Sequence, residues 1–152
     1  MEIQTLKNFL PEYMFCAATL IHLCEKGDSA YVWTGGLPDA YVVRPGAGVV
    51  QTIKSKNMPL GILDKNDFNS EPSLYRFEKG DKLILISDGI LEASCPLNAD
   101  MFGQARLIKA LESNHHNVFK GLIDAYDSYI GDQEQRDDVS LIELSAEPYN
   151  PK

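Results

Sequence analysis

Residues 82–93, KLILISDGILEA, constrain the fold most strongly, because an apolar run ends abruptly in an acidic residue beside a glycine. Such a run is typical of a strand at the centre of a sheet. Asp88 and Gly89 would then lie at the end of a rigid strand, which fixes the position of the carboxylate. The segment therefore predicts both a central strand and a candidate functional group.

Short strands separated by turns are expected over most of the first half of the chain. Residues 13–23 alternate two mostly apolar sets and predict a strand buried on both faces. AYVWT (30–34) and AYVVR (40–44) are β-branched and aromatic, so we expect antiparallel neighbours joined by a hairpin turn at GGLPD. Further strands are expected at VVQTI, SLYRF and DDVSLIEL, with an ordered loop over residues 55–72 packed against the core.

Apolar spacing also predicts helices. Residues 2–10 form a short helical pattern that stops at Pro11. Two more helices are marked by Phe102, Leu107, Ile108 and Leu111, and by Val118, Leu122, Ile123, Tyr126 and Ile130, with Gly131 as a C-terminal cap. Antiparallel strands, two helices and a final strand predict an α+β layered fold rather than a doubly wound parallel sheet.

Amino-acid composition limits the classes of partner and the cellular compartment that we expect. The 152 residues include 14 basic and 22 acidic ones, a formal charge of −8, which disfavours nucleic acid and anionic lipid and tolerates bound cations. The three cysteines have no CxxC spacing and are odd in number, which fits a reducing cytoplasm. MFCAATLIHLC is too short to span a bilayer, and no signal-peptide pattern is present, so we expect a cytoplasmic protein with no membrane association.

Asp137 and Asp138 precede the last expected strand, as Asp88 follows the central one. If the two strands are neighbours, three carboxylates converge at one rim of a sheet. Like charges at short range raise one another's pKa, so such a cluster is costly unless cations neutralise it. Magnesium and manganese prefer carboxylate and water oxygens, so the pattern predicts a site for a hard divalent ion.

Each feature also has a simpler interpretation. An isolated Asp-Gly is most often a turn, and an isolated Asp-Asp is most often solvated surface. His22 is expected to be a core or edge histidine, and His115 and His116 to face water between helices. The scattered cysteines, Cys16, Cys24 and Cys95, are expected to be buried small hydrophobes rather than zinc ligands.

Six segments in order resemble the C-terminal half of the metal-dependent serine/threonine phosphatases of the SpoIIE/RsbU type, also called PPM phosphatases. They are PEYMFCAATLIHL, YVWTGGLPDAYVV, MPLGIL, KGDKLILISDGILEA, MFGQARL and RDDVSLIEL. The combination also resembles the output domain of RssB-like response regulators. The resemblance runs over nearly the whole chain.

The resemblance implies two antiparallel sheets sandwiched between helices, in α/β/β/α layers. Residues 1–146 would be the C-terminal part of the phosphatase domain, with its N-terminal part missing, and residues 147–152 a polar tail. Asp88 takes the place of the metal-binding aspartate of the family's DG motif, and Asp137 that of its DD or DN motif. Gly89 and Asp138 would be accessory. The family uses two Mn²⁺ or Mg²⁺ ions to activate a water that attacks a phosphoserine or phosphothreonine.

Two departures qualify these implications. The family's N-terminal half, whose aspartates and glycine bridge the metals, has no counterpart here, and TGGL at residues 34–37 replaces the family's frequent NAGH. We therefore expect an incomplete two-metal site, no catalytic residue in this chain and little activity from it alone. Its partner is expected to be a phosphoprotein substrate or a sigma-factor or anti-sigma regulator, and the missing half predicts an apolar surface that favours a homodimer.

Two other functions stay open. The chain can be a degenerate phosphatase-fold adaptor that binds a sigma factor or an anti-sigma antagonist, which Leu37 and the missing half favour. It can also be a plain structural domain in which the aspartates only cap strand ends.

Overall fold

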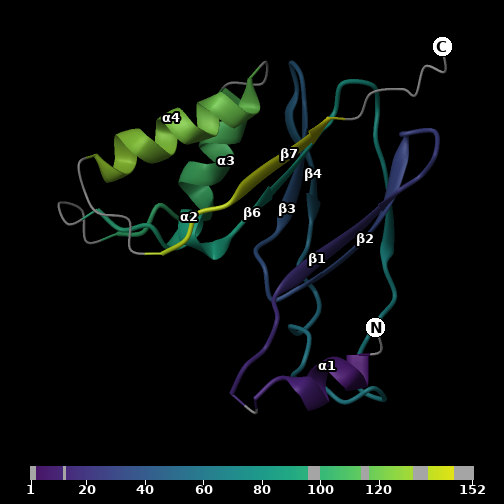
Figure 1. Cartoon of the computed structure of the whole chain (residues 1–152). Coiled ribbons are helices and arrows are strands. Elements are labelled where there is room, and N and C mark those ends of the chain that lie inside the picture. The colour runs from purple at the N-terminus through teal and green to yellow at the C-terminus, as the bar shows by residue number, and fades with distance from the viewer. Residues whose placement is uncertain (1–2, 12, 96–99, 114–116, 132–136, 146–152) are drawn as a thin grey trace. The chain divides into compact units, whose positions relative to one another are not determined.

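The computed structural model describes residues 3–11, 13–95, 100–113, 117–131 and 137–145. The chain contains two antiparallel sheets, each in its own compact unit (Figure 1). Met1–Leu37, Lys54–Phe77 and Glu147–Lys152 make up what we call the three-strand unit, and Pro38–Ile53 with Glu78–Ala146 make up the four-strand unit. The predicted tail, residues 147–152, lies outside the described residues.

The three-strand unit begins with helix α1 (Ile3–Phe9), at the place expected from the spacing before Pro11. Its sheet has the order β1-β2-β5, with strands at Ala18–Leu23 (β1), Ser29–Gly35 (β2) and Ser73–Arg76 (β5). β2 is the central strand, and both of its neighbours run antiparallel to it.

The loop over residues 55–72 is ordered against this unit. Leu60 exchanges two backbone hydrogen bonds with Cys16, each 2.8 Å long. The Trp33 indole donates to the carbonyl oxygen of Asn69 at 2.8 Å, and the Phe68 ring lies 5.4 Å from that of Trp33. The prediction of a packed loop is confirmed for these residues, although the side chains of Met58 and Ile62 are exposed.

The four-strand unit has the sheet order β4-β3-β6-β7. Its strands are Ala40–Arg44 (β3), Gly48–Ile53 (β4), Lys82–Ile86 (β6) and Leu141–Ser145 (β7), and its helices are Asp88–Glu92 (α2), Gly103–Ser113 (α3) and Val118–Ile130 (α4). β6 is an inner strand, as its apolar run predicts. α3 and α4 cover one face of this sheet (Figure 1).

Helices and sheet share one core in this unit. Tyr41, Ile84, Leu107 and Leu122 are each at most 1% exposed. They belong to one cluster that also contains Phe102 and Leu111. α4 ends where expected, since Gly131 has a φ of 62° and its amide donates to the carbonyl of Asp127. Helical spacing in the sequence therefore predicted both helices and the buried positions Leu107, Leu111, Val118 and Leu122, but Ile123, which the same spacing named, is 38% exposed.

Two antiparallel sheets flanked by helices confirm the predicted α+β class, but several details were wrong. The strands at AYVWT and AYVVR are not partners, because β2 pairs with β1 and β5 while β3 pairs with β4 and β6. The GGLPD segment is therefore a connection between sheets and not a hairpin turn. β-Branched patterns identify strands, but they do not identify which strands pair.

The predicted strand at residues 13–23 is shorter than expected and is not buried on both faces. Only Ala18–Leu23 is strand, and Leu20 and Leu23 are 59% and 57% exposed. β1 is an edge strand, so its apolar side chains have fewer neighbours than those of a central strand. The last strand begins at Leu141 rather than at Asp137.

The predictions for the isolated cysteines and histidines were correct in part. Cys95 is buried as predicted, but Cys16 is exposed and Cys24 is only partly buried. His22 lies on the edge strand β1, with its ring 6.4 Å from that of Tyr31, which fits the prediction of an edge histidine. His115 and His116 fall outside the described residues. Within the described part of the chain, no helix is long and apolar enough to cross a membrane.

Candidate metal centre

The Asp-Gly motif lies where β6 gives way to the short helix α2. Ser87 is the N-terminal cap residue, and Asp88 is the first residue of the helix. Asp88 is exposed, while Gly89 and Ile90 behind it are buried, Ile90 in the core. The Asp88 Oδ1 atom accepts a hydrogen bond of 3.1 Å from the Gly89 amide. Burial of the following two residues thus anchors a carboxylate that remains open to solvent.

The Asp-Asp motif lies just before β7. Asp137 and Asp138 are both exposed, and the Oδ1 atom of Asp137 accepts from the Asp138 amide at 2.7 Å. Val139 packs against the core of the unit and Leu141 starts the strand. This motif also presents carboxylates to solvent from an anchored backbone.

β6 and β7 are antiparallel neighbours, so the two motifs meet at one end of the sheet. Ile86 is opposite Leu141, and the Ser87 amide donates to the carbonyl oxygen of Ser140 at 3.0 Å. The Ser87 hydroxyl accepts from the Ser140 amide at 2.8 Å and donates to the carbonyl oxygen of Asp138 at 3.1 Å. The conditional prediction that the strands are neighbours is therefore confirmed.

Gly89 has a steric role at this junction. A β-carbon at residue 89 would overlap the Asp138 carbonyl oxygen and lie 3.1 Å from its carbonyl carbon. Any larger residue would push the Asp-Asp segment away from α2. Gly89 and Asp138, which the sequence analysis named as accessory, are thus in close backbone contact.

The junction does not gather all three carboxylates into one group. In the part of the chain that the structure describes, no three His, Cys, Asp or Glu side chains are arranged to hold a metal ion. Asp88 and Asp137 each accept a bond from the next residue's amide, and those local bonds orient them. The donor chemistry of two carboxylates fits Mg²⁺ or Mn²⁺, but two such ligands make only part of a site.

The TGGL segment, where the sequence departs from the family, contacts the loop over residues 55–72 of the same unit. A β-carbon at Gly35 would lie 2.5 Å from the Met58 carbonyl oxygen, and one at Gly36 would lie 2.5 Å from Pro59. Gly36 also has a φ of 77°, which favours glycine. The two glycines therefore allow the loop over residues 55–72 to approach the end of β2, and Leu37 beside them is partly buried.

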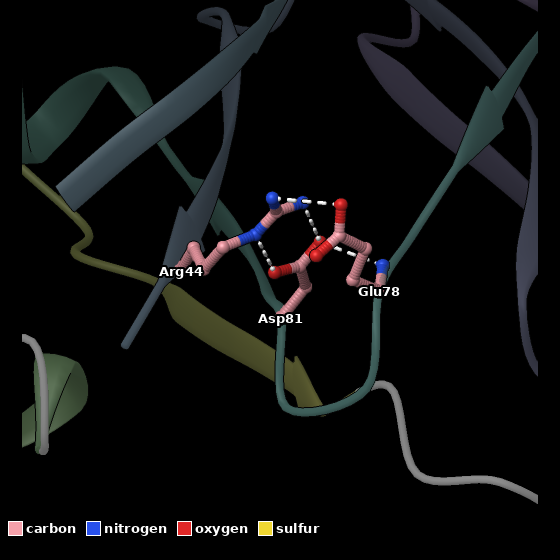
Figure 2. A network of polar contacts seen from close by, with 3 residues as sticks. All are labelled: Arg44, Glu78 and Asp81. Atoms are coloured by element: carbon pink, nitrogen blue, oxygen red, sulfur yellow. Dashed lines mark hydrogen bonds and ion pairs between the residues drawn. The ribbon is translucent and has the colours of Figure 1, made fainter. Parts of the chain in front are cut away.

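A second polar cluster lies at the opposite end of β6 (Figure 2). Arg44, the last residue of β3, donates from Nε to Asp81 Oδ1 at 2.8 Å and from Nη2 to Oδ2 at 3.0 Å. The Glu78 amide donates to Asp81 Oδ2 at 2.8 Å, and the Glu78 carboxylate pairs with Arg44 Nη1 at 2.9 Å. These contacts close the turn before β6, far along the strand from Asp88, and we assign them a structural role.

Asp81 in this cluster is 1% exposed. Burial is the largest single influence and raises its pKa, but the hydrogen bonds from Arg44 and from the Glu78 amide, with the charge of Arg44, together hold the pKa below its usual value. The pKa of Arg44 is raised, chiefly by its hydrogen bond to Asp81. The sequence analysis did not predict this ion pair, although its two parts are visible as an arginine at the end of one strand and an EKGD turn before another.

The architecture first defines a class: the two sheets and their helices form a PP2C-like phosphatase fold. The chain also belongs to a particular family, because the family described as Stage II sporulation protein E (SpoIIE) matches residues 3–147. The predicted resemblance to SpoIIE/RsbU-type phosphatases is confirmed. No curated protein matches the chain.

Three solved structures illustrate the fold. The SiaA-PP2C domain of Pseudomonas aeruginosa matches with a TM-score of 0.77 and 18% identity, over 94% of this chain and 57% of that one. The phosphatase domain of the cell fate determinant SpoIIE from Bacillus subtilis, presoaked with manganese, matches with a TM-score of 0.68 and 17% identity, over 98% and 65%. The RsbU and RsbW domains of a Mycobacterium tuberculosis protein match with a TM-score of 0.72 and 18% identity, over 98% and 42%. The chain thus spans less than two thirds of each of these relatives.

Proposed function

We propose that this chain is the C-terminal portion of a metal-dependent serine/threonine phosphoprotein phosphatase domain. The observation that carries the proposal is the junction of the Asp-Gly and Asp-Asp motifs at the paired ends of β6 and β7, closed by Ser87 and Gly89. A domain that uses the aspartates only to end strands has no need of this close contact. Membership of the SpoIIE family supports the same function.

In this proposal Asp88 and Asp137 hold a Mn²⁺ or Mg²⁺ ion, and Gly89 and Asp138 support them. When bound, such ions lower the pKa of a coordinated water and neutralise phosphoryl oxygens. The chain's own contribution is to present two anchored carboxylates from neighbouring backbones. A manganese-presoaked relative of the same fold supports this choice of ion.

The site in this chain alone is expected to be too sparse for efficient turnover. A two-metal centre needs enough ligands to keep its ions about 3.5–4 Å apart. The described residues offer no group of three metal-binding side chains. Positioning and electrostatic preorganisation each supply several kcal/mol of barrier lowering, so their loss should leave hydrolysis near background.

The test is hydrolysis of a phosphoserine peptide by this chain and by the full-length gene product that contains it, with manganese and with chelator. We expect chelator-sensitive activity in the full-length protein that Asp88→Asn abolishes, and little or none in the chain alone. Unchanged activity after substitution of both Asp88 and Asp137 would overturn the metal assignment. No activity in either protein would favour an adaptor instead.

We also propose a signalling role in the cytoplasm, with a phosphoprotein in sigma-factor control as the substrate. Support comes from matched structures described as RsbU and RsbW domains and as a cell fate determinant. A link to an RssB-like receiver stays a prediction from the sequence.

Finally, we propose that one face of the three-strand unit associates with a second copy of the chain. Leu20 and Trp33 are opposite each other in the sheet, as are Tyr31 and Leu74, so all four share one face. Leu20, Tyr31 and Leu74 are 59%, 42% and 46% exposed, and a pocket of about 590 Å³ opens there. The unit carries 8 acidic and 7 basic residues, so its own charges nearly balance and contribute little repulsion between two such faces.

Light scattering tests this association. We expect a dimer that Leu20→Asp converts to a monomer, while Ile142→Asp, at a site on β7 that is 53% exposed, leaves it intact. A monomer at high protein concentration, or a dimer unaffected by Leu20→Asp, would overturn the proposal. In that case the residues that related phosphatase domains have outside the match become the best candidates to cover the face.

A further inference from the structure

Ser87 connects the two acidic motifs more directly than any residue chosen from the sequence. Its hydroxyl accepts a hydrogen bond from the Ser140 amide at 2.8 Å and donates one to the Asp138 carbonyl oxygen at 3.1 Å. Ser87 immediately precedes Asp88, and the two groups that it bonds follow Asp137 closely. One side chain thus links the backbones that carry both candidate ligands.

We propose that Ser87 is a positioning residue that fixes Asp88 and Asp137 relative to each other so that both can bind one divalent cation. This inference rests on the proposed function. Ser87 acts through the backbone of residues 138–140 and is not itself assigned as a ligand.

The contact needs a hydroxyl in particular. A hydroxyl provides one donor and two acceptor lone pairs, so it can bridge an amide and a carbonyl at once. Alanine provides neither group, whereas threonine retains both. Loss of Ser87 would leave the Ser140 amide without its hydroxyl acceptor and the Asp138 carbonyl without its hydroxyl donor.

Strand pairing does not replace this contact. β6 and β7 are in register from Lys82 opposite Ser145 to Ile86 opposite Leu141, and the regular pairing ends there. Asp137 and Asp138 precede the strand, where the Ser87 hydroxyl and the fit of Gly89 under the Asp138 carbonyl act together with the Ser87 amide bond to Ser140 and the packing of Val139. Removing the hydroxyl should therefore loosen the Asp-Asp segment and leave the sheet paired.

Residues that orient metal ligands through hydrogen bonds commonly change metal affinity by about 10- to 100-fold when they are replaced. We expect a loss of this size for Ser87→Ala and a loss of less than about threefold for Ser87→Thr, which keeps the hydroxyl. The matched control is Ser128→Ala in α4, where the lost hydroxyl donates to the Asp124 carbonyl one turn earlier.

The experiment titrates the full chain with Mn²⁺ and follows the free aquo ion by electron paramagnetic resonance. Hydrogen exchange of the Ser140 amide is measured on the same variants without metal. The proposal requires weaker Mn²⁺ binding and faster Ser140 exchange in Ser87→Ala only, with both restored in Ser87→Thr. Circular dichroism establishes that the sheet is retained in each variant.

Two failures are distinguishable. If the unaltered chain binds Mn²⁺ in an Asp88-dependent way and Ser87→Ala binds it equally well, the inference about Ser87 is overturned and the proposed function stands. If the unaltered chain and Asp88→Asn bind Mn²⁺ equally or not at all, both are overturned.

Discussion

The two units of the chain bury their apolar residues very differently. Of the 19 buried hydrophobic residues described, only Ala30, Val32 and Trp33 belong to the three-strand unit. The same unit contributes 10 of the 15 exposed large hydrophobic residues, including Phe9, Tyr13 and Leu20. The four-strand unit therefore has a core of its own, whereas the three-strand unit has apolar surface still to cover.

The two units also differ in net charge, and here the four-strand unit is the one that carries the excess. The four-strand unit carries 14 acidic and 7 basic residues, while the rest of the chain is close to neutral. The Asp-Gly and Asp-Asp motifs both lie in the acidic unit. A negative field favours cations and repels a second copy, which agrees with the proposals of ion binding by the four-strand unit and of association through the three-strand unit.

The largest loss of stability is expected from a cavity in the core of the four-strand unit. Leu107→Ala removes a side chain that is 0% exposed and should lower the free energy of unfolding by about 2–5 kcal/mol. Leu20→Ala, at a site 59% exposed, should change it by no more than about 0.5 kcal/mol in the monomer. Denaturant unfolding measures both, and similar losses would contradict the contrast between the units.

A smaller effect is expected from the turn before β6. Asp81→Asn removes a buried carboxylate that accepts from Arg44 and from the Glu78 amide, and should cost about 1–3 kcal/mol. The pKa of Asp81 is lower in the folded chain than its usual value near 3.9. Its stabilisation is therefore complete above about pH 4–5 and is lost as the pH falls through the folded pKa.

The measurement is the free energy of unfolding between about pH 2 and pH 6 for the natural chain and Asp81→Asn. The natural chain should lose more stability on acidification than the variant does. Parallel pH profiles would show that the Arg44–Asp81 contact does not contribute as described.

Local patterns predicted the elements better than their partners. Helical spacing located α3 and α4, and the apolar run located β6 as an inner strand, because these signals depend on one segment at a time. The false pairing of AYVWT with AYVVR arose because short sequence separation suggests a hairpin, while the structure places these strands in different sheets. Pairing depends on residues far along the chain.

The candidate site shows the same division. Asp88 and Asp137 were predicted as metal ligands from motifs, and their segments are neighbours as the prediction required. The contributions of Ser87, of Ser140 and of the carbonyl of Asp138 were missed, because a hydrogen bond across more than 50 residues leaves no local pattern. The close fit of Gly89 also becomes visible only when the opposite backbone is present.

The central claim is that Asp88 and Asp137 of the acidic unit bind one cation together. Calorimetric titration of Mn²⁺ into the natural chain, Asp88→Asn, Asp137→Asn and the double variant tests it most directly, with Asp124→Asn as a control for loss of an exposed carboxylate on α4. We expect each single substitution at the site to weaken binding about 10-fold or more, the double variant to lose little beyond that, and the control to bind normally. Independent, additive losses, or full affinity in the double variant, would contradict the shared site.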